Sequence, residues 1–240
     1  GEILAIVGGS GAGKTTLLKL SAGLIIPQHG ATQLNNIAIT SKNRNQLFPV
    51  IGFLNSEVDH QLFCPTVYED IAFGPRNFNF TASEIKKQVQ AAAAIMQVEH
   101  LLQRQCYTLS SGEKKRVGLA GLLAMRTQVL VLDEPFANLD YQAQLQLVQI
   151  LNQLNLQQRI TIIISTHDME VVPHFADRVV VLDEGKIACD GEVHKILQQV
   201  DLLQSMRLKA PVITQYFYHK KHLGTLPINL QEALKINENH

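Results

Sequence analysis

The chain has 240 residues, equal numbers of basic and acidic side chains (21 of each) and three cysteines. This length allows one substantial domain with a large core, while a formal net charge of +0 argues against the basic surface that drives sequence-independent nucleic-acid binding. We therefore expect no direct nucleic-acid partner. The apolar runs are far shorter than the roughly 20 residues of a membrane-spanning helix, so we expect no transmembrane helix. Cys64, Cys106 and Cys189 lack the spacing of a metal site or a redox pair.

The first predicted element is an apolar strand over residues 3–7, followed by a glycine-rich turn and a helix. Residues 8–15 fit the phosphate-loop pattern G-x-x-x-x-G-K-[ST]. Its glycines let backbone N–H groups approach a polyphosphate, Lys14 supplies a cation to the β and γ phosphates, and the Thr15 hydroxyl suits Mg²⁺. The candidate phosphate-binding residues are Gly8, Gly9, Ser10, Gly11, Ala12, Gly13, Lys14, Thr15 and Thr16. Because Gly1 directly precedes the strand, we expect the natural domain to begin earlier, with N-terminal strands that this chain lacks.

From residue 23 to residue 125 the pattern changes from strands to helices. Strands are predicted over residues 32–34, 37–39 and 51–54, with a short polar helix near residues 42–47. After a loop over residues 55–66, a helix over residues 67–73 is expected to stop at Gly74 and Pro75. A longer helix covers residues 83–96, and a turn over residues 109–112 opens another that continues to Met125. Residues 55–125 are therefore predicted to form a mainly helical subdomain.

Strand patterns return after residue 125. Residues 129–132 and 160–164 are almost entirely apolar, as parallel strands covered on both faces are, and a helix from residue 141 to about residue 156 connects them. Strands over residues 179–182 and 186–188 flank the turn Asp183, Glu184 and Gly185 and form a hairpin. Helices follow over residues 192–197 and 201–208, and the polar tail after them is unassigned. The sequence predicts an α/β fold with a mainly parallel sheet flanked by helices, an inserted helical subdomain and a small antiparallel β portion.

Two carboxylates, Asp133 and Glu134, end the apolar strand over residues 129–132. Open α/β sheets bind their ligands at this carboxyl edge. Asp133 is placed to hold Mg²⁺ directly or through water, and Glu134 to polarise a water in line with the γ phosphate.

Three further motifs identify a family that the chain resembles, the ATP-binding cassette (ABC) ATPases, which are P-loop NTPases that drive membrane transporters. The signature sequence LSGGQ of this family is matched by Leu109, Ser110, Ser111, Gly112 and Glu113 at the head of a helix. Asn138, Leu139 and Asp140 stand where the family has its D-loop. His167 lies after the next strand, where the family places a γ-phosphate contact. A lone histidine there is more often structural, and the position within the motif favours the functional interpretation.

The resemblance implies a mechanism, cofactors and partners. ATP would be bound with Mg²⁺ on Thr15 and Asp133, and Lys14, Glu134 and His167 would be the catalytic residues. Two ATPase subunits, identical or different, would pair head to tail, so that the signature of one closes over the ATP of the other. An integral membrane subunit would dock on the helical subdomain, and the chain would be peripheral on the cytoplasmic face of the membrane. The implied domains are an ATPase over residues 1–198, with core residues 1–54 and 126–198 and helical residues 55–125, and an extension over residues 199–240.

A narrower resemblance lies in residues 59–75, DHQLFCPTVYEDIAFGP, which are similar to the DQLF…TV.EDVAFGP segment of energy-coupling-factor ATPases. Those proteins drive uptake of cobalt, nickel or vitamins. In the alternative interpretation this segment is a generic amphipathic helix, and Phe63, Tyr68 and Phe73 are core aromatics.

Three departures from the family pattern leave a second function open. The adenine-stacking aromatic that normally precedes the phosphate loop is absent, Ser111 replaces a signature glycine, and alignment on Gln61 puts Ser56 where the family has a glutamine. The alternative is an ABC ATPase outside transport, or one deficient in hydrolysis, that acts as a nucleotide-dependent regulatory module.

Overall fold

The fold is given by a computed structural model, which describes residues 1–47, 49–220 and 224–237. The chain divides into two compact units. The first holds Gly1 and Thr16–Ile163, and the second holds Glu2–Thr15 and Ile164–His240. Two elements cross this division, helix α1 (Lys14–Ser21) and strand β6 (Thr161–Thr166).

The strands of the first unit form a parallel pair and a small antiparallel ribbon. β4 (Ile51–Leu54) lies parallel to β5 (Val129–Asp133), whose three central residues are fully buried. β2 (Gln33–Leu34) and β3 (Ile37–Ala38) pair antiparallel around Asn35 and Asn36, both at positive φ, as a two-residue hairpin turn requires. These strands and the short helix α2 (Arg44–Leu47) confirm the predicted elements.

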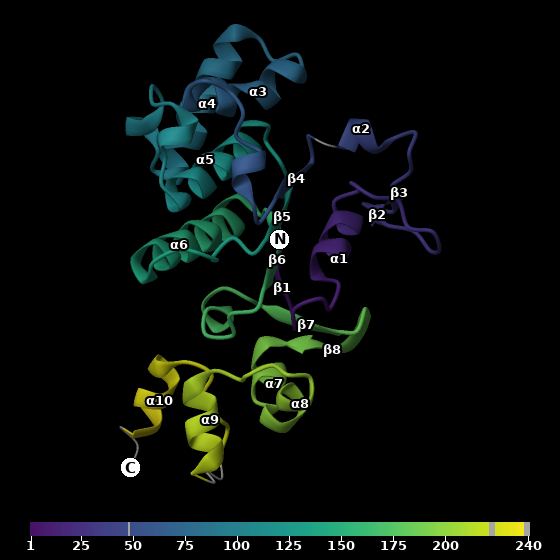
Figure 1. Cartoon of the computed structure of the whole chain (residues 1–240), viewed down its shortest axis with the longest axis vertical. Helices are drawn as coiled ribbons and strands as arrows, with labels where there is room; N and C mark the ends of the chain where they lie inside the picture. The colour runs from purple at the N-terminus through teal and green to yellow at the C-terminus, as the bar shows by residue number, and fades with distance from the viewer. Residues whose placement is uncertain (48, 221–223, 238–240) are drawn as a thin grey trace. The chain divides into compact units, whose positions relative to one another are not determined.

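Three helices of the first unit pack on one another (Figure 1): α3 (Val67–Asn77), α4 (Ala82–Met96) and α5 (Ser111–Ala124). Each begins with a capping box, in which a hydroxyl accepts from the third backbone N–H and the glutamate there accepts from the cap's N–H. The pairs are Thr66 with Glu69, Thr81 with Glu84, and Ser110 with Glu113. The sequence prediction placed these helices within one or two residues of their true starts.

The prediction that Gly74 and Pro75 stop α3 was wrong, because the helix continues to Asn77. Proline lacks an N–H, and here it removes only one bond near the helix end, while the N–H groups of Phe78 and Phe80 still donate to the carbonyls of Gly74 and Pro75. Gly74 serves packing instead, since a Cβ there would lie 2.5 Å from the sulfur of Met125.

Helix α6 (Tyr141–Gln158) begins at Asp140 and turns one side into the core of the first unit. The Asp140 carboxylate accepts a hydrogen bond from the backbone N–H of Ala143 at 2.8 Å, which stabilises the helix start. Its buried residues are Leu147, Val148, Ile150, Leu151 and Leu154. The helix ends at Gln158, two residues beyond the predicted end, and Arg159 after it adopts the left-handed conformation.

In the second unit β1 (Ile3–Gly8) lies parallel to β7 (Arg178–Asp183), and β7 pairs antiparallel with β8 (Lys186–Glu192). The turn between β7 and β8 has Glu184 at φ 46° and Gly185 at φ 78°, the left-handed backbone that a tight hairpin needs. The predicted hairpin is confirmed, although β8 runs four residues beyond its predicted end.

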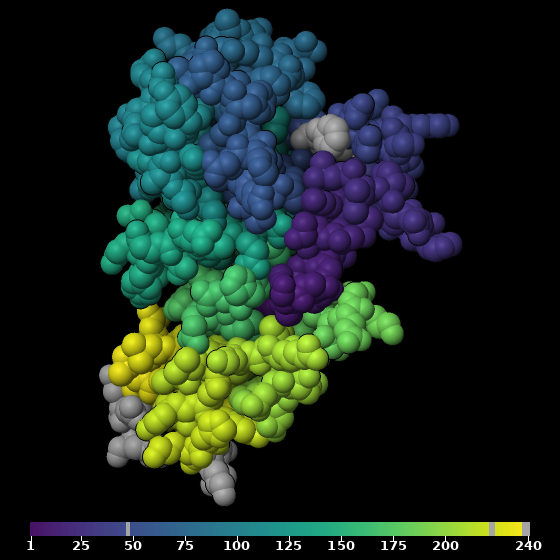
Figure 2. Space-filling model, in the orientation of Figure 1, coloured from purple at the N-terminus to yellow at the C-terminus, as the bar shows by residue number. Residues whose placement is uncertain are grey.

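The C-terminal part of the second unit is helical: α7 (Val193–Leu197), α8 (Val200–Ser205), α9 (Val212–His219) and α10 (Leu230–Asn237). α8 ends before the predicted residue 208, because Arg207 turns left-handed at φ 59° and the Leu208 N–H returns to the carbonyl of Leu203. The unassigned tail packs against α7 and α8 (Figure 2). Its buried Thr214 hydroxyl donates to Pro227 at 2.7 Å, and the Gln198 side chain donates to Leu226.

Among the described residues, every helix is too short or too polar to span a bilayer.

Candidate functional site

The phosphate loop joins β1 to α1 in a backbone shape that only glycines adopt freely. Gly11 and Gly13 have φ values of +79° and +99°, where other residues are strained. A Cβ added at Gly9 or Gly11 would meet nothing within 4 Å, so the backbone there is open for a ligand to approach. At Gly8 a Cβ would lie 2.5 Å from the carbonyl oxygen of Leu182, so glycine is needed for packing against β7.

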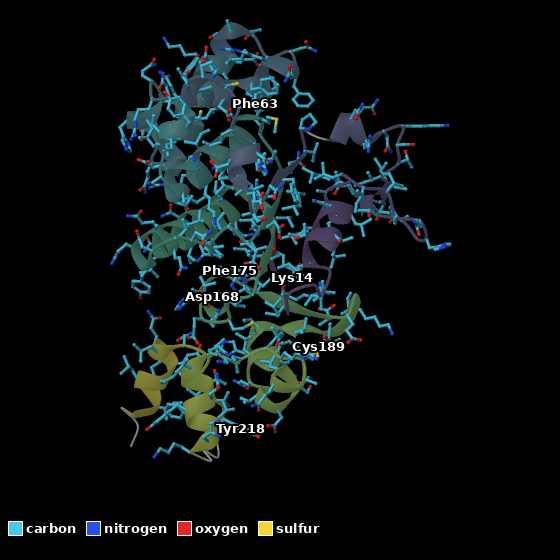
Figure 3. The ribbon with its side chains drawn as sticks, viewed as in Figure 1. Lys14, Phe63, Asp168, Phe175, Cys189 and Tyr218 are labelled. Atoms are coloured by element: carbon cyan, nitrogen blue, oxygen red, sulfur yellow. The ribbon has the colours of Figure 1, made fainter. Side chains whose placement is uncertain are left out.

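Lys14 lies at the start of α1 (Figure 3). Its Nζ donates to the carbonyl oxygens of Gly8 at 2.9 Å and Gly9 at 3.1 Å. The ammonium is therefore held over the loop itself, where a bound polyphosphate would meet it. Its role in binding phosphate stays a prediction.

A cavity of about 500 Å³ lies beside this loop within the second unit. Its walls are the loop, the end of β7 and the end of α8: Gly9, Ser10, Gly11, Ala12, Asp183, Glu184, Ser205, Met206 and Arg207. The Gly185 N–H donates to the Ala12 carbonyl at 3.1 Å and ties the hairpin turn to the loop. Sequence reasoning missed the α8 contribution, because α8 lies about 190 residues after the loop and shares no motif with it.

His167 follows β6 in the second unit and is exposed, whereas Ser165 before it is fully buried. The Thr166 hydroxyl accepts from the backbone N–H of Asp168 at 3.1 Å, and Asp168 accepts from the N–H of Glu170. These bonds fix the turn that carries the imidazole. Contact of His167 with a γ phosphate stays a prediction.

The acidic turn, residues 133–137, leaves β5 in the first unit. Asp133 is 2% exposed, and Glu134 is half-buried at φ 48°, a left-handed conformation that is uncommon outside glycine. The Ala137 N–H closes the turn on the Glu134 carbonyl at 3.2 Å. The left-handed backbone at Glu134 ends the strand there, and the role of this glutamate as a base stays a prediction.

The signature residues begin α5, and their first turn lies against the D-loop of the same chain. The Ser111 hydroxyl donates to the Asn138 carbonyl at 3.2 Å. A Cβ at Gly112 would lie 3.4 Å from the Leu139 side chain. Ser110 caps the helix, and its backbone N–H donates to Glu113 at 2.7 Å, which lowers the pKa of Glu113. The departure at Ser111 is therefore accommodated by a hydrogen bond to the D-loop.

Lys115, two residues beyond the signature, is a site residue that the motif comparison missed. Its ammonium donates to the carbonyl of Glu134 at 3.2 Å and to that of Ala137. The side chain is 3% exposed, and burial lowers the pKa of Lys115 to about 8, against a smaller opposing effect of the Glu134 charge. Polar residues flank Lys115 in the sequence, and such a run is typical of a solvent-exposed helix face. The sequence pattern therefore did not indicate that Lys115 is buried.

Ser56 lies after β4 in a loop that Gln61 braces. The Gln61 side chain accepts from the Asn55 N–H at 2.7 Å and donates to the Phe53 carbonyl at 3.0 Å. The Asn55 side-chain oxygen accepts from the Ser56 hydroxyl and from the Glu57 N–H. Ser56 is exposed and its hydroxyl is engaged locally.

The donor types predicted for Mg²⁺, a threonine hydroxyl and an aspartate carboxylate, fit a hard cation that takes few protein ligands. The described residues contain no group of three or more His, Cys, Asp or Glu side chains that could hold a metal alone. Such a cation would therefore depend on nucleotide phosphates for most of its coordination.

Comparison with known proteins gives the family. Residues 1–137 match the family model described as ABC transporter. An energy-coupling factor transporter ATP-binding protein, EcfA of Methanoculleus marisnigri, is 39% identical over 210 residues, which cover 88% of this chain and 76% of EcfA. CbiO1 of Clostridium perfringens, part of the ABC transporter complex CbiONQ, has a TM-score of 0.78 at 35% identity, covering 90% of this chain and 87% of CbiO1.

A third relative shows the fold. The cassette MJ0796, solved as a dimer bound to ADP and phosphate, has a TM-score of 0.72 at 24% identity and covers 80% of this chain and 85% of its own. The predicted P-loop NTPase fold, with its mainly parallel sheet and small antiparallel part, is confirmed. The family match, the relatives and the predicted motifs agree, and the chain belongs to the ABC transporter ATP-binding family.

Proposed function

We propose that this chain is the ATP-hydrolysing subunit of an energy-coupling-factor-type importer for metal ions or vitamins. Its relatives include ATPase subunits of that class. The observation that carries the importer assignment is an exposed apolar groove on the helical part of the first unit. The groove has a volume of about 320 Å³ and is lined by Phe53, Leu54, Leu62, Phe63, Phe73, Phe78, Leu122 and Met125 among others.

The two aromatic side chains at the mouth of this groove are not core residues, contrary to the generic interpretation. Phe63 is 64% exposed and Phe73 is 43% exposed, and their ring centroids lie 4.7 Å apart in an edge-to-face contact. Asp70 holds the loop in place by accepting from the N–H groups of Phe63 and Cys64, both at 3.0 Å. A rigid loop that exposes apolar anchors fits a helix-in-groove partner, here a helix of an integral membrane subunit.

In the proposed reaction the candidate site residues have separate roles. Lys14 and the loop N–H groups would bind the β and γ phosphates of ATP, and Thr15 and Asp133 would hold Mg²⁺. Glu134 accepts a proton from the attacking water, and His167 contacts the γ phosphate. Ser110, Ser111 and Gly112 at the head of α5 meet the ATP of a second ATPase subunit, in a head-to-tail dimer.

The proposed domains are an ATPase over residues 1–198, with helical residues 55–125, and an extension over residues 199–240. Docking on a membrane subunit would make the chain a peripheral protein of the cytoplasmic membrane face.

Phe63→Glu is expected to uncouple transport from ATP hydrolysis rather than abolish hydrolysis. A charge at the mouth of the groove would have to be desolvated against the membrane subunit, which costs far more than the apolar contact that it replaces. The measurements are copurification with the membrane subunit and solute uptake into vesicles. Leu156→Glu is the control, because Leu156 is 75% exposed on α6, outside the groove. Normal assembly and uptake by the Phe63 variant would place the docking site elsewhere.

The regulatory alternative is favoured by one observation, the short side chain of Ser56 where the family has a glutamine. Serine can reach the attacking water only through a bridging water, so the link between γ phosphate and helical subdomain is loose. A steady-state ATPase measurement separates the two functions, because the regulatory module would bind ATP without turnover.

Ser56→Gln is expected to raise the steady-state ATPase rate several-fold and to lower the Mg²⁺ concentration for half-maximal activity, because the longer side chain reaches the site directly. Ser83→Gln, on an exposed position of α4, is the control. If Asn55 or Glu57 has taken over the role, Ser56→Gln is neutral and Asn55→Ala or Glu57→Ala lowers the rate. Were all three variants neutral, this loop would not sense nucleotide.

A further inference from the structure

A buried lysine of the first unit, Lys115, connects the signature helix α5 to the acidic turn, which are separate motifs in the sequence. Lys115 extends from α5 to two carbonyl oxygens of the acidic turn, those of Glu134 and Ala137. The stem and ammonium are 97% removed from solvent, since the residue is 3% exposed. A buried lysine is rare unless its charge is satisfied, and here the satisfying atoms are backbone carbonyls.

The backbone that Lys115 binds is strained. Glu134 and Asn138 both lie in the left-handed region, at φ 48° and 59°. Non-glycine residues keep such conformations only where the surroundings hold them. Lys115 binds the carbonyl of Glu134 itself and that of Ala137, the residue before Asn138, while Ser111 binds the carbonyl of Asn138. Two side chains of one helix thus hold both strained positions.

The chemistry of this contact favours an ammonium group. Three N–H donors on a long stem can serve the carbonyls of residues 134 and 137, and the nearby Glu134 charge favours the protonated form against burial. A methionine of similar length would fill the same space but would remove one donor from each of these two carbonyls.

We propose that Lys115 is a positioning residue that locks the acidic turn and the D-loop to the signature helix, so that Glu134 and the signature move as one body. This inference rests on the proposed function, in which Glu134 acts on the ATP of its own subunit and the signature on the ATP of the partner. Lys115 would then couple the two ATP sites of a dimer from within one chain.

The kinetic test compares three variants. Lys115→Met is expected to lower kcat by about 10- to 100-fold, the cost of misplacing a reacting group by about an ångström. The KM for ATP should stay within about threefold of the parent, because the phosphate loop is untouched. Lys115→Gln, which keeps N–H donors on a shorter stem, is expected to recover part of the loss. Lys114→Met, one residue away on the same helix, removes an ion pair with the exposed Asp59 and should match the parent.

A second measurement needs no turnover. In Lys115→Met, the amides of Ala137 and Leu139, which donate to Glu134 and Phe136, should exchange hydrogen faster than in the parent or in Lys114→Met. A parent without ATPase activity would refute the proposed function, and amide exchange would still decide whether Lys115 holds the turn. Unchanged exchange, or unchanged kcat in both Lys115 variants, would overturn the inference.

Thermal unfolding of each variant serves as the control that it is folded. Should Lys115→Met fail to fold, Lys115→Gln decides, since it keeps polar contacts and the helix. A folded Lys115→Gln with lowered kcat and unchanged KM supports positioning, and one with the kinetics of the parent refutes it.

Discussion

Glu134→Gln is expected to slow ATP hydrolysis by about 10²- to 10⁴-fold, the usual loss when a general base is removed. Glutamine keeps the size of the side chain and its left-handed turn, but it cannot accept the proton of the attacking water. ATP binding should survive, because the phosphate loop lies on other residues. The ATP-bound dimer should therefore accumulate, which size-exclusion chromatography with ATP will show beside single-turnover kinetics.

The control for this variant is Glu99→Gln, which removes a carboxylate from an exposed 3₁₀ turn of the same unit. It should hydrolyse ATP like the parent and form no lasting dimer. Near-normal turnover by Glu134→Gln would remove Glu134 from the catalytic role and would favour another base.

Lys14→Ala is expected to abolish measurable ATP binding, the step that precedes the hydrolysis affected by Glu134→Gln. Each charge-assisted hydrogen bond to a phosphate contributes about 1.5–3 kcal/mol, so loss of the two bonds to the β and γ phosphates should weaken the affinity by at least about 100-fold. The loop would lose the two bonds from Lys14 to the carbonyls of Gly8 and Gly9, but it would keep the bond from Gly185 to Ala12.

Isothermal titration with ATP measures this loss, and Lys19→Ala, in the last turn of the same helix, is the matched control. The two predictions separate binding from chemistry, since Glu134→Gln keeps the titration signal and Lys14→Ala does not. A Lys14→Ala protein that binds ATP as tightly as the parent would contradict the assignment of the loop.

The elements that the sequence predicted well are those in which local chemistry decides the structure. The phosphate loop, the hairpin turn at Gly185 and the strand at β5 each depend on a glycine pattern or an apolar run that has few alternatives. The candidate ATP-binding residues and the acidic turn came from motifs of this kind, and their roles in ATP binding and hydrolysis stay predictions.

The misses have tertiary causes. Gly74 and Pro75 look like a helix stop, yet Gly74 makes room for Met125, a residue 51 positions away. The tail after residue 208 reads as polar, but α9 packs on α8 and Glu232 of α10 contacts His194 of α7, and a short pattern cannot show such contacts. Lysine is a strongly polar residue, yet Lys115 is buried, and its ammonium donates hydrogen bonds to two carbonyls of the acidic turn that lie far from it in the sequence.

The shared start of α3, α4 and α5 has a consequence for which substitutions these helices tolerate. In a capping box the third helical residue must only accept from the cap's N–H, which a glutamine does as well as a glutamate. At Glu113, where the family signature has glutamine, either residue can therefore complete the capping box, although only the glutamate also forms the ion pair with Arg104. Position 110 has no such freedom, because the cap needs a short side-chain acceptor at that one place. In related chains, exchange of glutamate and glutamine at the fifth signature position should therefore leave the helix start intact. Loss of the capping side chain at the second position should destabilise it.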